Sequence, residues 1–179
     1  MTDIGITLFD TAIGRCGVAW AGARLRAVQL PERSHQATVR RLVARAEAPV
    51  VEDPPPAVQR AIDAMTALLA GQESDLEVIA IDLDDIADFD RAVYAVTRSI
   101  RPGQTMTYGE VARLIGDPGA ARAVGRALGA NPLPIVIPCH RVLGADGRLV
   151  GFSANGGVDT KRRMLLIEGC PAVAPSLFD

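Results

Sequence analysis

The chain has 179 residues, of which 49% are hydrophobic, and a formal net charge of −2 at pH 7. This length allows one compact unit or two small domains with an ordinary hydrophobic core. No apolar run reaches the length of about 20 residues needed to cross a bilayer, and the N-terminus lacks the pattern of a signal peptide, so we expect a cytoplasmic protein. Three cysteines and two histidines show neither the spacing of a disulfide framework nor that of a zinc site. We therefore predict no metal and no cofactor.

Charge is distributed unevenly along the sequence. Residues 1–100 carry ten Arg and fifteen Asp or Glu, whereas residues 101–179 carry eight Arg and one Lys against six acidic residues. The net charge of the whole chain argues against a protein that coats nucleic acid by bulk attraction. The positive second part nevertheless permits a local surface that meets phosphates.

The first part of the chain is predicted to form an α/β domain with a small antiparallel sheet. Three hydrophobic runs, separated by turns that contain glycine, predict the strands of a β-meander at residues 4–9, 16–20 and 25–30. Apolar residues at helical spacing then predict helices over 39–46 and 58–69. The apolar run 78–83 predicts one further strand.

An acidic segment separates this domain from the rest of the chain. Residues 73–90 contain eight acidic residues and no basic ones, which is typical of a solvated linker. We place the boundary near residue 86, which gives an N-terminal α/β domain of residues 1–86 and a mainly α C-terminal domain of residues 87–179. A helix with Asp88 as its N-cap is expected next. Its apolar face would contain Phe89, Val93, Val96 and Ile100.

Two short helices joined by a turn are predicted after this helix. Residues 107–115 form the first, residues 116–119 a tight connection, and residues 120–129 the second, which is the layout of a helix-turn-helix. The first helix is expected to bury Val111, Leu114 and Ile115. Any two helices joined by a turn share this layout, so the pattern alone does not establish DNA binding.

The second of these helices has an outer face of mostly small residues. Its core side would carry Val124, Ala127 and Leu128, and its other side Arg122, Gly125, Arg126 and Gly129. Small residues allow a backbone to approach closely and an Arg can act as a wedge, which suits sequence-independent contact with a minor groove. From these residues alone, a close-packed core helix with two solvated arginines stays an open alternative.

The segment that leads to Cys139 is rich in proline and in aliphatic residues. Pro132, Pro134 and Pro138 stiffen an extended chain, and residues 135–137 are expected to be buried, so the interior presents Cys139. A thiol with an ordinary pKa near 8.5 is only about 3% thiolate at pH 7.

A neighbouring histidine could activate this thiol. His140 would lower the pKa of Cys139 if its side chain folds back toward the sulfur, and Glu168 could orient the imidazole. The other cysteines, Cys16 and Cys170, are expected to be buried and inert.

Several motifs stand in a fixed order around Pro138-Cys139-His140-Arg141-Val142. They are Thr107-Tyr108-Gly109-Glu110, Ala121-Arg122-Ala123-Val124-Gly125, Asn131-Pro132, Gly151-Phe152-Ser153, and residues 165–169. With this set the chain resembles the O6-alkylguanine-DNA alkyltransferases, also called methylated-DNA–protein-cysteine methyltransferases, over about residues 89–169, and more loosely over the first 86 residues. The resemblance implies a ribonuclease-H-like N-terminal domain and a winged-helix-like C-terminal domain.

The resemblance implies direct-reversal repair of DNA. A nucleotide bearing O6-alkylguanine, and also O4-alkylthymine, would be flipped out of duplex DNA, and the alkyl group would move irreversibly to Cys139. His140 would act through a water with Glu168 behind it, and Asn131 would brace the turn that supports the active-site loop. Double-stranded DNA with this lesion is the expected partner of a monomer that needs no membrane and no obligate protein partner.

The resemblance also implies residues that contact DNA. Arg122 would enter the duplex as a finger, and Tyr108 would crowd the adjoining phosphate and later reach a guanine ring nitrogen. Carbonyls of Cys139 and Val142 would read the exocyclic amine, and Ser153 would form a hydrogen bond near O6. The other positions expected at DNA or at the lesion are Ala121, Ala123, Gly125, Phe152 and Arg126.

Three positions depart from the common pattern of the family. Asp90 follows Phe89 where Gln is frequent, Phe152 stands where Tyr is frequent, and Arg126 adds a charge to the DNA-facing helix. The range of alkyl sizes that the pocket accepts is therefore left open.

Three other functions compete with repair. A damage sensor that only binds the lesion would resemble the alkyltransferase-like proteins, but these lack the acceptor cysteine, whereas Cys139 is present. A helix-turn-helix regulator would normally need an additional DNA-reading domain, which no segment supplies. A cysteine hydrolase or redox enzyme would use Cys139 and His140 but would leave Arg122 and Tyr108 unexplained.

Overall fold

The computed structural model describes residues 3–173, which divide into two compact units. The first unit comprises Met1–Asp85 together with Pro132–Val136, and the second comprises Ile86–Asn131 and Ile137–Asp179. The segment Pro132–Val136 belongs to the first unit because it bonds to that unit's sheet: the N–H of Val28 donates to the carbonyl of Pro132 at 2.9 Å.

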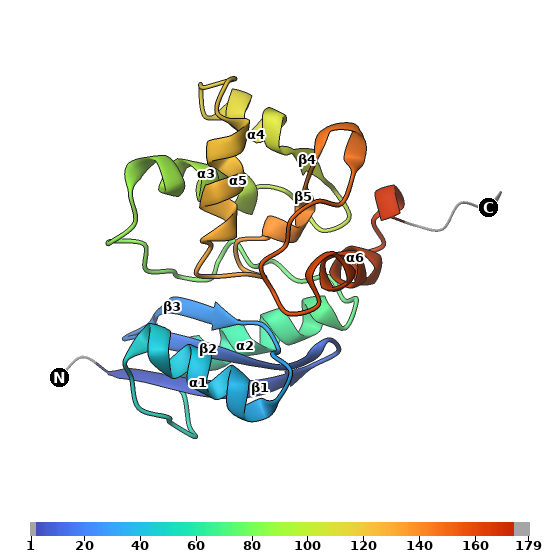
Figure 1. Cartoon of the computed structure of the whole chain (residues 1–179). Coiled ribbons are helices and arrows are strands. Elements are labelled where there is room, and N and C mark those ends of the chain that lie inside the picture. Colours follow the sequence, from blue (N-terminus) through green and yellow to red (C-terminus); the bar gives the residue numbers. More distant parts are fainter. Residues whose placement is uncertain (1–2, 174–179) are drawn as a thin grey trace. The chain divides into compact units, whose positions relative to one another are not determined.

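The first unit is built on a three-stranded antiparallel sheet with the order β1-β2-β3, which confirms the predicted meander (Figure 1). Its strands are β1 (Ile4–Thr11), β2 (Gly14–Ala21) and β3 (Arg24–Gln29). Gly14 and Gly22 take positive φ angles of 120° and 58° at the two turns, where a side chain would be strained. These glycines therefore set the tight turns that keep consecutive strands paired.

Two helices cover this sheet, as predicted. They are α1 (His35–Ala46) and α2 (Pro56–Leu69). Five consecutive residues of β2, Cys16 to Trp20, are buried, and because side chains alternate across a strand, both faces of the sheet are covered. Leu42 of α1 packs on one face against Ile6, Ala19 and Ala27.

The acidic segment does not form the predicted strand. Residues 78–83 contribute a single parallel bridge, Leu25 to Ile81, and Val78 is 77% exposed. Nor is the segment a free linker, because its carboxylates pair with arginines of β3: Arg24 with Asp82 and Asp84, and Arg26 with Asp82 and Asp85. These ion pairs hold the chain at the arginines of β3, and the run pairs with the sheet only at Ile81.

The second unit is mainly helical. Its helices are α3 (Asp88–Arg98), α4 (Tyr108–Leu114), α5 (Ala121–Gly129) and α6 (Gly157–Ile167), with 3-10 turns η1 (Cys139–Arg141), η2 (Ala145–Gly147) and η3 (Pro171–Val173). Two short strands, β4 (Met106–Thr107) and β5 (Val142–Leu143), pair in parallel. No helix in residues 3–173 is long and apolar enough to cross a membrane.

Helices α3, α4 and α5 pack against one another, and α4 and α5 form the predicted helix-turn-helix (Figure 1). A capping box starts α4, in which the Thr107 side chain accepts from the N–H of Glu110 and the Glu110 carboxylate accepts from the N–H of Thr107. The prediction that α4 buries Leu114 is wrong, since this side chain is 61% exposed. At about 100° of rotation per residue, Leu114 lies off the stripe formed by the buried Val111 and Ala112.

The predicted cap of α3 is also wrong. Ala87 occupies the N-cap, and Asp88 lies in the first turn, where it pairs with Arg91. A carboxylate in the first turn still stabilises the positive end of the helix dipole.

Candidate active site

The chain enters the site through a buried, sharply turned segment. Ile135, Val136 and Ile137 are at most 2% exposed, which confirms their predicted burial. Ile135 has a φ of +75°, a left-handed conformation that β-branched residues rarely adopt. The side-chain amide of Asn131 donates to the carbonyl of Ile137 at 2.8 Å and so fixes the backbone two residues before Cys139.

His140 and Glu168 form a buried pair beside Cys139. The His140 Nε2 atom lies 2.8 Å from the Glu168 carboxylate, and both side chains are at most 2% exposed. Because Nε2 donates to the carboxylate, the His140 Nδ1 atom is the open acceptor, and it has no hydrogen-bond partner among the residues described. The structure therefore brings together the pair that the sequence proposed.

Arg141, to which the sequence analysis gave no role, completes this network. Its guanidinium donates to both oxygens of Glu168, at 3.0 Å and 2.8 Å, while remaining only 5% exposed. Burial alone would raise the pKa of Glu168, but the hydrogen bond and charge of His140, together with those of Arg141, hold that pKa at about 2. Glu168 is thus a fixed anion that stabilises a cation on His140.

The sequence predicts activation of Cys139 only if His140 folds back toward the sulfur, and at rest the pKa of this thiol is raised. Burial raises its pKa, and a hydrogen bond with Asn131 and the positive charge of Lys161 oppose this rise. Burial likewise lowers the pKa of His140, against the hydrogen bond and charge of Glu168. A neutral thiol therefore stands beside a neutral imidazole at rest.

Lys161 is the second functional residue that the sequence analysis missed. Its side chain is 1% exposed, and its Nζ donates to the carbonyl oxygens of Val142 at 2.6 Å and Val150 at 3.2 Å. Burial lowers its pKa to about 8, while the charge of Cys139 acts in the opposite direction. A signal was present in the sequence, since Lys161 lies on the same buried face of α6 as Met164 and Leu165.

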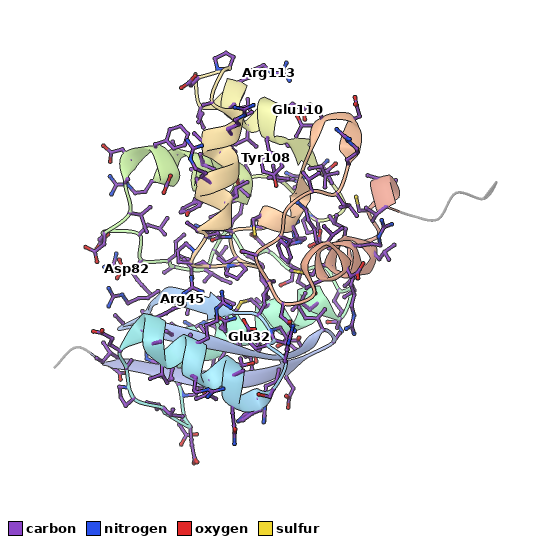
Figure 2. All side chains as sticks on the ribbon, in the orientation of Figure 1. Glu32, Arg45, Asp82, Tyr108, Glu110 and Arg113 are labelled. Atoms are coloured by element: carbon purple, nitrogen blue, oxygen red, sulfur yellow. The ribbon has the colours of Figure 1, made fainter. Side chains whose placement is uncertain are left out.

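Tyr108 is the first residue of α4 and is labelled in Figure 2. The Lys161 Nζ atom is 5.7 Å from the centre of its ring, and its hydroxyl donates to the carbonyl of Val150 at 3.5 Å. Burial raises the pKa of Tyr108, and the charge of Cys139 adds to this effect. The phenol is therefore a proton donor at neutral pH.

The two faces of α5 separate as predicted. Its core side is buried at Val124, Ala127 and Leu128. Arg122 and Arg126 are exposed one turn apart, with the half-buried Ala121, Ala123 and Gly125 between and beside them. Figure 1 shows α5 standing beside α4, which carries Tyr108 at its start.

The remaining predicted residues lie on the strand and loop that follow η1. Val142 is buried, and its carbonyl accepts a hydrogen bond from Lys161. Because a carbonyl oxygen has two lone pairs, it can accept a hydrogen bond from a second donor. Phe152 is half-buried and Ser153 is exposed. Among residues 3–173, no three His, Cys, Asp or Glu side chains cluster as a metal site would require.

The chain was compared with known proteins by sequence. A family model described as "6-O-methylguanine DNA methyltransferase, DNA binding domain" matches residues 88–170. The methylated-DNA–protein-cysteine methyltransferase of Mycobacterium tuberculosis is 44% identical over 126 residues, which cover 70% of this chain and 74% of that relative. The protein of the same name from Salmonella typhimurium is 53% identical over 81 residues, or 45% of this chain and 46% of that relative.

Solved structures extend the likeness to the whole chain. The crystal structure of the M. tuberculosis O6-methylguanine methyltransferase matches with a TM-score of 0.75 at 35% identity and covers 99% of this chain and 100% of that one. The M. tuberculosis OGT in complex with DNA matches with a TM-score of 0.73 at 36% identity, over 98% and 99% of the two chains. The chain belongs to the family of the methylated-DNA–protein-cysteine methyltransferases.

Proposed function

We propose that this protein repairs O6-alkylguanine in duplex DNA by moving the alkyl group to the sulfur of its own Cys139. One observation carries this proposal: a nearly buried cysteine adjoins a histidine whose far nitrogen is held by an anchored carboxylate. A base next to the nucleophile and a third group that orients the base are the arrangement that activates a nucleophile.

The proton of Cys139 passes to Nδ1 of His140, directly or through a water. The imidazolium that results is stabilised by Glu168, which stays ionised because Arg141 clamps it. As the S–C bond forms, the bond between carbon and O6 breaks, and guanine gains a proton. The product is a thioether without a good leaving group, so each molecule reacts once.

The raised pKa of Cys139 suits such a single-use reagent. A neutral buried thiol reacts slowly with stray electrophiles, whereas a permanently exposed thiolate would be consumed by them. The charge of Lys161 lowers the cost of forming the thiolate at the moment of transfer. Tyr108, protonated at neutral pH, is placed to donate to the guanine that leaves.

The exposed face of α5 is proposed as the DNA-binding surface. Arg122 fills the space of the flipped nucleotide, and Arg126 adds a phosphate contact one turn away. Ala121, Ala123 and Gly125 let the helix backbone approach the minor groove, which requires small side chains rather than base-reading ones. We expect one monomer to act on one lesion in double-stranded DNA.

The pocket that receives the base is proposed to lie around η1 and the loop after β5. The second lone pair of the Val142 carbonyl and the carbonyl of Cys139 accept from the exocyclic amine, and Ser153 donates near O6. Phe152 forms an apolar wall without the hydroxyl that a Tyr would bring. Asn131 holds the turn before Cys139. O4-alkylthymine, which presents its alkyl group on a smaller base, is expected as a second substrate.

A comparison of two substrates tests this proposal. Arg122→Ala should slow repair of an O6-methylguanine duplex by roughly 10²-fold or more while changing the reaction with free O6-benzylguanine by less than about threefold, because the free base needs no flipping. Single-turnover loss of each substrate, measured by chromatography, gives both rates. Equal losses on both substrates would contradict the role of Arg122.

The alternative of a sensor without repair activity is tested by the acceptor itself. Cys139→Ser should keep the affinity for the lesion duplex and lose repair, with lesion loss by the unaltered protein stopping at one equivalent. A sensor would bind the duplex equally well before and after this substitution and would leave the lesion intact in both cases.

A further inference from the structure

The site contains a buried amine that repair of a simple alkyl group does not consume. Lys161 is the single lysine of the chain, since the other 18 cationic residues are arginines. An arginine cannot lose its proton in a protein, whereas a lysine can and then becomes a nucleophile. Lys161 therefore differs from every other cation here in its chemistry.

Lys161 is hydrogen-bonded to the backbone at the end of the turn that carries Cys139. Its Nζ bonds to the carbonyl of Val142, three residues after Cys139, and to that of Val150. The ring of Tyr108, 5.7 Å from Nζ, borders the same space. The N–H of Val142 in turn donates to the carbonyl of Cys139, so the hydrogen bond of Lys161 ends on the same 3-10 turn that carries the acceptor.

We propose that Lys161 is a second acceptor, which captures the far end of a bifunctional alkyl group after Cys139 has taken the near end. The proposal rests on the proposed function, because Cys139 must accept the group first. The substrate class is an O6-(2-haloethyl)guanine in duplex DNA, whose alkyl group still carries a leaving group on its second carbon.

The chemistry balances without an oxidant or a reductant. Transfer forms the bond from Cys139 Sγ to the first carbon, breaks the bond to O6, and leaves a 2-chloroethyl thioether. The sulfur then displaces chloride and forms a three-membered episulfonium ring. The Lys161 amine attacks a ring carbon, so that an N–C bond forms, a C–S bond opens, and the amine proton passes to solvent. The product is an ethylene bridge between Cys139 and Lys161, with chloride and a proton released.

The surroundings favour Lys161 over water as the nucleophile. The side chains of Cys139 and Lys161 are 8% and 1% exposed, so few water molecules compete near the ring. Burial brings the pKa of Lys161 to about 8, which leaves on the order of a tenth of the amine neutral at pH 7. An ordinary lysine with a pKa of about 10.4 would have less than about 0.1%.

Intact mass tests the proposal. The protein is mixed with a duplex that carries freshly introduced O6-(2-chloroethyl)guanine, and in parallel with an O6-methylguanine duplex. The methyl duplex should add about 14 Da, which verifies the first transfer independently, and the chloroethyl duplex should end at a gain of about 26 Da, the mass of an ethylene bridge that replaces two hydrogens. A protease that cleaves after lysine should then fail to cut the product at position 161, where it cuts the unreacted chain.

Other products would overturn the proposal. A gain of about 44 Da, from a hydroxyethyl group on Cys139, would mean that water captures the ring, and a covalent bond between protein and DNA would mean that the duplex does. Absence of the 14 Da gain with the methyl duplex would instead contradict the proposed function.

Lys161→Arg is the matched variant, because it keeps the positive charge and removes the nucleophile. Because Lys161 also stabilises the Cys139 thiolate, this variant should transfer the methyl group more slowly than the unaltered protein. The reaction with the methyl duplex is therefore run to completion, where a gain of about 14 Da shows that the variant is folded and transfers. With the chloroethyl duplex, the 26 Da product should be lost in favour of the hydroxyethyl one. Persistence of the 26 Da product in this variant would assign the second bond to another residue and overturn the role of Lys161.

Discussion

Cys16 and Cys139 are both buried thiols, yet their surroundings differ in kind. Cys16 lies in the regular strand β2, and burial raises its pKa to about 12 with only the Thr11 hydroxyl opposing. Burial also raises the pKa of Cys139, but Asn131, Lys161 and two backbone N–H groups oppose it. The third cysteine, Cys170, is also buried and packs in an apolar cluster.

The difference shows that burial alone keeps a thiol protonated and unreactive. A polar network around a buried thiol allows it to act as a nucleophile. Cys139 follows the left-handed Ile135, and its neighbour His140 faces an anchored carboxylate, whereas Cys16 has regular strand neighbours. The chemistry of the acceptor therefore depends on the residues around it more than on its exposure.

The largest effect is expected when each of the two cysteines is replaced by alanine in turn. Cys139→Ala should abolish alkyl transfer, because it removes the acceptor, while Cys16→Ala should leave the single-turnover rate within about twofold and cost about 1 kcal/mol of stability or more through a small cavity. Lesion loss and urea unfolding measure these outcomes. Transfer by Cys139→Ala, or its loss in Cys16→Ala with the fold intact, would break the comparison.

The anchored carboxylate is expected to have the next largest effect. Glu168→Gln removes the anion that stabilises a protonated His140, so the transfer rate should fall by roughly 10² to 10³-fold, within the range of general base catalysis. Exposed Glu52→Gln is the control and should leave the rate unchanged. If Glu168→Gln transfers at the normal rate, His140 does not act as the base.

The Glu168 carboxylate should also make the free energy of unfolding depend on pH in the acid range. Its pKa is about 2 in the folded chain against an ordinary 4.5, so its contribution is fully present above about pH 4.5 and is lost as the pH falls toward 2. The contribution is on the order of 3 kcal/mol. The gap in unfolding free energy between the unaltered protein and Glu168→Gln should shrink from pH 7 to pH 3. A gap that is constant with pH would contradict the anchored anion.

The smallest effect concerns the backbone before Cys139. At Ile135, where φ is +75°, a Gly variant should be more stable than an Ala variant by about 1 kcal/mol, because both lose the side chain but only Gly relieves the strain. At the equally buried Val136, whose backbone is not left-handed, Gly should be less stable than Ala by about 0.5–1 kcal/mol. Urea unfolding of the four variants gives the signs, and the same sign at both positions would contradict the strain.

Much of the second unit was predictable, because short periodic patterns determine it. The spacing of Val124, Ala127 and Leu128 predicted the buried face of α5, and adjacent motifs placed Cys139 near His140 and Glu168. The hydrogen-bond partners of a side chain within the folded site were harder to predict. The motif names Arg141 but does not show that its guanidinium bonds to both oxygens of Glu168.

The errors share one physical cause, which is competition from tertiary contacts. The run 78–83 is apolar enough for a strand, but Asp82 within it, and Asp84 and Asp85 after it, pair with Arg24 and Arg26. For the thiol of Cys139, burial has the largest effect on the pKa, and a local motif does not reveal this burial. The local sequence shows neither how deeply a side chain is buried nor which residues far along the chain contact it.

The most direct test of the central claim is intact mass after the protein is mixed with a duplex that contains one O6-methylguanine. The account predicts a gain of about 14 Da that saturates at one equivalent and maps to the peptide with Cys139, while Cys16 and Cys170 stay unmodified. Loss of the lesion without a mass gain, or a methyl group on another residue, would contradict Cys139 as the acceptor.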